Sequence, residues 1–175
     1  AALPGMRERT LTCSSLSKTY SITGWRLGYR IGPAEVIEGA RKVHDFLTIG
    51  AAAPLQAAAI PGLLMPDSYY ADLQQLYTKK RNHFLNGLRR LGLSFYEPQG
   101  AYFVLVDIDA LLRQPRFAGL NDYALCEWMI VNLGVAAVPG SSFFRTGGAN
   151  YIRLHFARSQ ETLDEALKRL EGLAP

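Results

Sequence analysis

The sequence has few cysteines and no long apolar run. Two cysteines, Cys13 and Cys126, occur among 175 residues, too few for a disulfide framework and at no zinc-ligand spacing. We therefore expect a cytoplasmic protein with two reduced thiols, both buried as small hydrophobic groups. The chain lacks an apolar stretch of about 18 residues and a signal-peptide pattern at its start, so it predicts neither a membrane span nor secretion.

A concentrated positive surface is also missing. The chain carries 19 Lys and Arg against 15 Asp and Glu, a formal net charge of +4, but the basic residues are dispersed. The densest group, Lys79-Lys80-Arg81 with Arg89-Arg90, ends a predicted helix that has Asp67 and Asp72 near its start. Acids early and bases late are favoured by the helix dipole. The charge pattern therefore gives no support for nucleic-acid binding.

What remains is a composition typical of a globular α/β protein. Hydrophobic residues make up 49% and charged residues 19% of the sequence, enough for a sizeable core. In the segment 34–47, Val36, Ile37, Ala40, Val43 and Leu47 recur at helical spacing along one side. Periodicity and turn residues predict helices at 34–47, 51–64, 67–91, 122–133 and 160–170, and strands at 10–17, 25–31, 94–96, 102–107, 135–138 and 151–156.

One loop combines residues that suggest a specific chemistry. Lys18 lies in a hydroxyl-rich segment that follows a predicted strand, and Arg26 lies eight positions later. A desolvated lysine near another cation can attack a carbonyl, whereas an arginine among Ser and Thr hydroxyls suits a phosphate. Pyridoxal 5'-phosphate carries both an aldehyde and a phosphate. From these residues alone, a solvated lysine and a salt-bridged arginine remain the more frequent explanation.

The whole loop, Ser15 to Gly28, resembles the pyridoxal-phosphate attachment motif of the class I and II aminotransferases of fold type I. The resemblance continues through 98–103, 138–143 and 151–157. It implies an α/β fold made of the C-terminal portion of a fold type I aminotransferase: a remnant of the large-domain sheet and an α+β small domain. Residues 1–66 would end the large cofactor-binding domain, 67–92 form a connecting helix, and 93–175 form the small C-terminal domain.

The resemblance also implies roles for five residues. Lys18 would form the internal aldimine and later move the proton at the substrate α-carbon, while Ser15 and Arg26 would hold the cofactor phosphate. Arg153 would bind the α-carboxylate of the substrate; its alternative is a strand arginine paired with an acid. Gly100 would allow the backbone to approach the substrate, or is an ordinary turn glycine. No metal site is expected.

These roles predict an aminotransferase that moves an amino group between an α-amino acid and a 2-oxo acid. A homodimer is implied by the family, with 48–56 resembling its interface segment. Seventeen residues precede Lys18, so the family's partner for the pyridine nitrogen and other upstream groups are expected to be missing, and the chain alone is expected to be inactive. A carbon-sulfur lyase of the same fold and a non-catalytic remnant or interaction domain are the alternatives.

Overall fold

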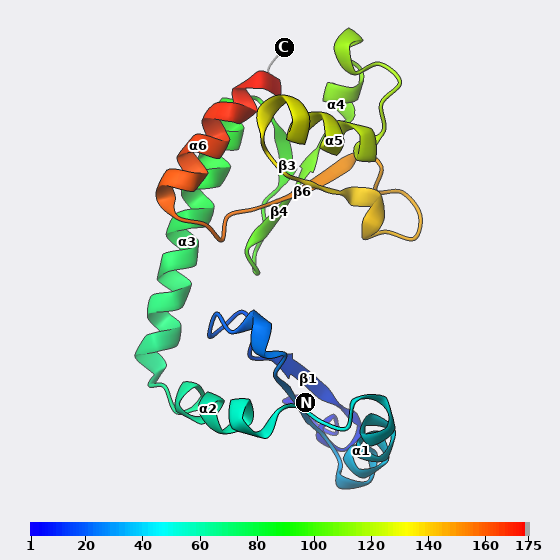
Figure 1. The fold of residues 1–175 in the computed structure, drawn as a ribbon, viewed down its shortest axis with the longest axis vertical. Helices are drawn as coiled ribbons and strands as arrows, with labels where there is room; N and C mark the ends of the chain where they lie inside the picture. The colour runs from blue at the N-terminus through cyan, green and yellow to red at the C-terminus, as the bar shows by residue number, and fades with distance from the viewer. Residues whose placement is uncertain (174–175) are drawn as a thin grey trace. The chain divides into compact units, whose positions relative to one another are not determined.

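A computed structural model describes residues 1–173, which form two compact units with a boundary between Asp67 and Ser68. Each unit has its own helices and strands (Figure 1). Each also has its own cluster of buried side chains. The chain contains both helices and small sheets, as the sequence predicts. None of the helices within residues 1–173 has the length and apolar character needed to cross a lipid bilayer.

The first unit contains one antiparallel strand pair and two helices. Strand β1 (Thr12–Ser15) pairs with β2 (Gly28–Ile31), and Ser15 stands opposite Gly28. A Cβ atom at position 28 would lie 2.7 Å from the carbonyl oxygen of Ser14, so only glycine fits this close approach. The other elements are helices α1 (Ala34–Thr48) and α2 (Ala53–Leu63) and the 3-10 turns η1 (Arg7–Arg9) and η2 (Thr23–Trp25).

The small core of this unit holds the β1–β2 connection against α2. Leu16 and Leu27 lie at the two ends of the connection and are buried together with Ala59 of α2. Partly buried residues complete the cluster: Tyr20, Ile22, Trp25 and Leu55. The connection between the strands is therefore packed in place by apolar contacts on both of its ends.

Much of the apolar surface of this unit is exposed. The apolar side of α1 is largely exposed, with Val36 49%, Val43 60% and Leu47 76% accessible. Cys13 is also exposed, because every residue of β1 is exposed in a sheet of only two strands. The prediction that both thiols are buried is thus wrong for Cys13 and confirmed for Cys126.

The second unit is a four-stranded antiparallel sheet covered by helices. Its strand order is β3-β4-β6-β5. The strands are β3 (Ser94–Tyr96), β4 (Phe103–Asp107), β5 (Val138–Pro139) and β6 (Tyr151–His155). The helices are α3 (Asp67–Arg90), α4 (Asp109–Leu112), α5 (Asp122–Leu133) and α6 (Gln160–Leu170), with 3-10 turns η3 (Pro115–Phe117), η4 (Gly140–Ser142) and η5 (Glu171–Leu173).

The alternation of side chains along β4 and β6 separates the two faces of this sheet. Val104 and Val106 of β4, with Ile152 and Leu154 of β6, are at most 4% exposed and join one core with residues of α3, α5 and α6. Helices α3 and α6 run side by side (Figure 1), joined by a 2.6 Å contact between His83 and Asp164. The intervening strand residues, Arg153 among them, point to the other face.

Two strands begin three residues later than the sequence predicts, β2 at Gly28 and β5 at Val138. Residues 25–27 do not extend, because η2 ends at Trp25 and Arg26 takes a left-handed conformation. Residues 135–137 do not pair either. The N–H of Gly134, which has a left-handed conformation, bonds to the carbonyl of Ile130, and that of Val135 bonds to Met129; the first bond is the αL motif that closes the end of α5. Pairing with β6 therefore starts only at Val138.

Candidate functional site

The β1–β2 connection, residues 16–27, carries Lys18 on a backbone that folds back on itself. The N–H of Leu16 still bonds to the carbonyl of Leu27 at 3.1 Å, as in a strand pair, and the N–H of Tyr20 then folds back to the carbonyl of Leu16 at 3.2 Å. Leu16 and Ser17 are buried, whereas Lys18, the next residue, is exposed. The buried pair fixes the backbone from which the Lys18 side chain projects.

A short hydrogen-bond relay supports the Lys18 amine. Nζ of Lys18 donates to Oγ1 of Thr23 at 3.4 Å, and this hydroxyl donates its own hydrogen to the carbonyl oxygen of Ser17 at 3.1 Å. Because the Thr23 proton is used in the second bond, its oxygen accepts from the lysine. Residues 1–173 leave Lys18 exposed, so they do not supply the desolvation that the sequence analysis expects.

Arg26 is turned back toward the same turn by an unusual backbone. Its φ is 57° and its ψ 41°, a left-handed conformation that is uncommon for a residue with a side chain and that marks functional turns. In this conformation Nη1 donates to the carbonyl oxygen of Thr23 at 2.9 Å. One guanidinium nitrogen is thereby anchored, and the others remain available to an anion.

The donors on this turn fit a ligand with an aldehyde and a phosphate. Ser15 ends β1, and its hydroxyl oxygen accepts the Ser17 N–H at 3.1 Å, which leaves its own hydrogen free to donate. Ser15 at the end of β1, with Lys18 and Arg26 in the β1–β2 connection, thus supplies a hydroxyl, an amine and a guanidinium. A phosphate accepts hydrogen bonds from the first and the last, and an aldehyde reacts with the second.

Arg153 lies in the second unit on β6 and is held by aromatic rings. The guanidinium carbon is 5.0 Å from the ring centroid of Phe103 and 4.2 Å from that of Phe143. Its side chain makes no hydrogen bond or ion pair within residues 1–173, so the alternative of a structural salt bridge has no acidic partner there. Cation–π contacts hold a guanidinium while its N–H edge stays free for a carboxylate.

A neighbouring histidine adds little positive charge near Arg153. Partial burial lowers the pKa of His155, and the positive charges of Arg158 and Arg153 lower it further. The neutral imidazole is therefore favoured near neutral pH. Arg153 and Arg158 then carry the positive charge of this strand end.

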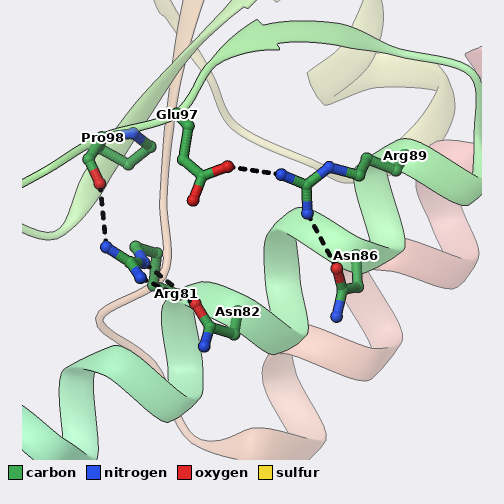
Figure 2. A network of polar contacts seen from close by, with 6 residues as sticks. All are labelled: Arg81, Asn82, Asn86, Arg89, Glu97 and Pro98. Carbon is green, nitrogen blue, oxygen red and sulfur yellow. Dashed lines mark hydrogen bonds and ion pairs between the residues drawn. The ribbon is translucent and has the colours of Figure 1, made fainter.

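Gly100 lies in the β3–β4 connection, which two arginines of α3 hold from below (Figure 2). Arg81 donates to the carbonyl oxygen of Pro98 at 3.2 Å, and Arg89 bonds to the Glu97 carboxylate at 2.6 Å. A Cβ at Gly100 would meet no atom within 4 Å, and the positive φ of this turn, 58°, belongs to Ala101. Neither packing nor backbone conformation within the described residues therefore requires glycine at this position.

Sequence reasoning missed three residues of these arrangements. Thr23, Phe103 and Phe143 lie inside the motifs that carry the resemblance, but their contacts with Lys18 and Arg153 depend on the folded chain. Thr23 alone could have been suspected, because a hydroxyl five positions from the lysine lies in the same turn. The ring contacts of Arg153 join residues 10 to 50 positions apart.

Comparisons with known proteins agree with these motifs. The family model for aminotransferase class I and II matches residues 2–170. Methionine aminotransferase of Escherichia coli K12 is 37% identical over 173 residues, which are 98% of this chain and 43% of the relative. Kynurenine–oxoglutarate transaminase 1 of Rattus norvegicus is 33% identical over 194 residues, covering 100% of this chain and 46% of the relative.

A solved structure gives the same result. N-succinyldiaminopimelate aminotransferase of Mycobacterium tuberculosis superposes with a TM-score of 0.88 at 34% identity, covering 99% of this chain and 44% of that structure. The chain therefore spans less than half the length of the relatives that it matches. The predicted fold, the C-terminal portion of a fold type I aminotransferase, is confirmed by this match.

Proposed function

This chain belongs to the class I and II aminotransferase family, and from that membership we propose that it is the lysine-bearing part of a pyridoxal-phosphate-dependent aminotransferase. The family depends on pyridoxal 5'-phosphate. The observation that carries the proposal is the β1–β2 connection: Ser15 directly precedes it, and Lys18 and Arg26 lie within it. We assign residues 1–66 to the end of the large domain, 67–92 to a connecting helix and 93–175 to the small domain.

In this proposal each site residue has a defined role. When bound, the cofactor supplies an aldehyde that bonds to amines and a ring that accepts electron density from the substrate α-carbon. The Lys18 amine would hold the cofactor through its aldehyde. Once free, the same amine would move the proton at the substrate α-carbon. Its bond to Thr23 limits the positions that the amine samples.

The remaining residues bind and orient. Ser15 and Arg26 donate hydrogen bonds to the cofactor phosphate, since both have free donors on the same turn. Arg153 binds the substrate α-carboxylate through its free N–H edge. Gly100 is assigned, from the family resemblance alone, to a place where the backbone approaches the substrate.

A product analysis tests the reaction type. The protein encoded by the complete reading frame is incubated with methionine or kynurenine as amino donor and 2-oxoglutarate as acceptor, the compounds that the names of the relatives suggest. We expect equal amounts of glutamate and of the 2-oxo acid derived from the donor. Released ammonia without glutamate would indicate a carbon-sulfur lyase. No product, with no visible absorption of bound cofactor, would indicate a non-catalytic domain.

We also propose a cytoplasmic homodimer. The segment 48–56 resembles the family's interface segment. Exposed apolar side chains lie just before it and within it: Phe46 is 94%, Leu47 76% and Ile49 87% accessible. Apolar surface of this kind is typical of interfaces between subunits. Sedimentation of the complete protein is expected to give twice the mass of one chain. Replacing Phe46 by Glu is expected to shift the equilibrium toward monomer, and a monomer without this change would contradict the proposal.

A further inference from the structure

Asp122, the first residue of α5, is a carboxylate that is only 2% exposed. A buried carboxylate needs hydrogen-bond donors, and both of its donors come from Ser141. The backbone N–H of Ser141 lies 2.9 Å and its hydroxyl 2.6 Å from Oδ2 of Asp122. The helix itself is capped by Asn121, whose side chain accepts the N–H of Ala124 at 2.9 Å. The Asp122 carboxylate is therefore not needed to cap α5, and it accepts hydrogen bonds from the loop residue Ser141 instead.

Independent contacts show that this loop is built to a fixed shape. The hydroxyls of Tyr123 and Ser142 are 3.0 Å apart, so the first two residues of α5 hold two successive loop residues. Gly140 is buried, and a Cβ there would overlap the carbonyl oxygens of Gly148 and Tyr151. Burial and the charge of Asp122 also raise the pKa of the Cys126 thiol to about 11, as expected one helical turn from an anion.

The loop leads directly to the ring that contacts Arg153. Phe143 follows η4, and its N–H bonds to the carbonyl of Gly140 at 2.9 Å. Phe143 is 44% exposed, so burial in the core does not fix its ring. Its contact with Arg153, at 4.2 Å from the guanidinium carbon, is closer than that of Phe103. The position of the Phe143 ring therefore depends on how η4 is held.

We propose that Asp122 is a positioning residue for substrate binding. Through Ser141 it fixes η4, and through η4 it holds the Phe143 ring against the guanidinium of Arg153. The inference rests on the proposed role of Arg153 as the carboxylate-binding residue. A flexible arginine loses side-chain entropy when it binds a carboxylate. A ring that restrains the guanidinium beforehand lowers this loss and leaves the N–H groups free, whereas an acidic partner would occupy them.

The test measures substrate affinity separately from turnover in the protein from the complete reading frame. Asp122→Asn and Phe143→Leu are each expected to raise KM for the amino donor about three- to tenfold, the size of one cation–π contact. We expect kcat to stay within about twofold, because neither residue moves a proton. Glu127→Gln, which removes an exposed negative charge from the same helix, is the matched control and is expected to leave KM unchanged.

Two further measurements separate positioning from folding. The Kd of propionate, a carboxylate with no amino or keto group, is expected to rise by the same factor as KM in both variants. The double variant is expected to show no larger effect than Phe143→Leu alone, because both changes act through one ring. Phe143→Leu leaves the buried core untouched, so an unchanged KM in this variant still overturns the inference if Asp122→Asn does not fold.

The outcomes distinguish this inference from the proposed function. If Arg153→Lys raises KM and Phe143→Leu leaves KM and the propionate Kd within about twofold of the unchanged protein, the positioning role is wrong while the proposed function stands. If Arg153→Lys also leaves KM unchanged, the carboxylate-binding role of Arg153 fails, and this inference fails with it.

Discussion

Replacing Lys18 by Ala is expected to lower kcat by about 10³-fold or more, because the variant loses the amine that holds the cofactor and moves the proton. Folding should be preserved. The Lys18 side chain is exposed, and the one hydrogen bond that it makes within residues 1–173, to Thr23, is long at 3.4 Å. The measurement is the rate of glutamate formation from an amino donor and 2-oxoglutarate, with thermal unfolding recorded for each variant.

Lys18→Arg is the matched control for charge. Arginine keeps the positive charge and the length of the side chain, but it stays protonated and cannot attack an aldehyde. We therefore expect this variant to be as inactive as Lys18→Ala. Activity within a few fold of the unchanged protein in either variant would contradict the assigned role of Lys18.

The second large effect is expected at Arg153. Arg153→Lys keeps the charge but loses the planar pair of N–H donors, and a hydrogen bond to a charged group contributes about 1.5–3 kcal/mol. We expect KM for the amino donor to rise by about ten- to 100-fold, with a smaller change in kcat. The measurement is the dependence of the initial rate on donor concentration.

A nearby arginine controls for general electrostatics. Arg158 is exposed, lies five residues further along the chain, and contributes to the lowered pKa of His155 as Arg153 does. Arg158→Lys also keeps the charge, and it is expected to change KM by less than about twofold, because Arg158 is not assigned to bind the substrate carboxylate. Equal effects of the two substitutions would mean that Arg153 acts through charge alone and not through a directed pair of hydrogen bonds.

Local signals explain why some elements could be predicted to the residue. Helix α5 has the predicted bounds because Asn121 caps its start and Gly134, with a φ of 64°, ends it. Helix α6 likewise begins after Ser159, whose hydroxyl accepts the N–H of Thr162. Capping residues act within a few positions of the helix end, so their effect is visible in the sequence.

Other features depend on the folded backbone or on contacts between residues that are far apart in the sequence. Arg26 takes a left-handed conformation without being glycine, so the later start of β2 left no sequence signal. The apolar spacing of α1 was visible, but within residues 1–173 no residue of this helix is buried, since burial requires a partner surface. The hydrogen bond that Ser141 donates to the buried Asp122 carboxylate joins residues 19 positions apart and could be found only in the folded chain.

Part of the candidate site could be predicted from the sequence. Ser15, Lys18 and Arg26 were selected from one continuous motif, and they lie at or within the β1–β2 connection, whose two ends are packed by Leu16 and Leu27. The expected desolvation of Lys18 was not found among the described residues, because burial depends on the surrounding chain rather than on the motif. The rings that hold Arg153 come from two other segments.

The central claim, that Lys18 carries the cofactor, is tested most directly by covalent trapping. The protein from the complete reading frame is mixed with pyridoxal 5'-phosphate, reduced with borohydride, digested and mapped by mass spectrometry. We predict one pyridoxyl-phosphate group, attached to the peptide that contains Lys18. A label on other lysines with none on Lys18, or an unlabelled protein, would contradict the account.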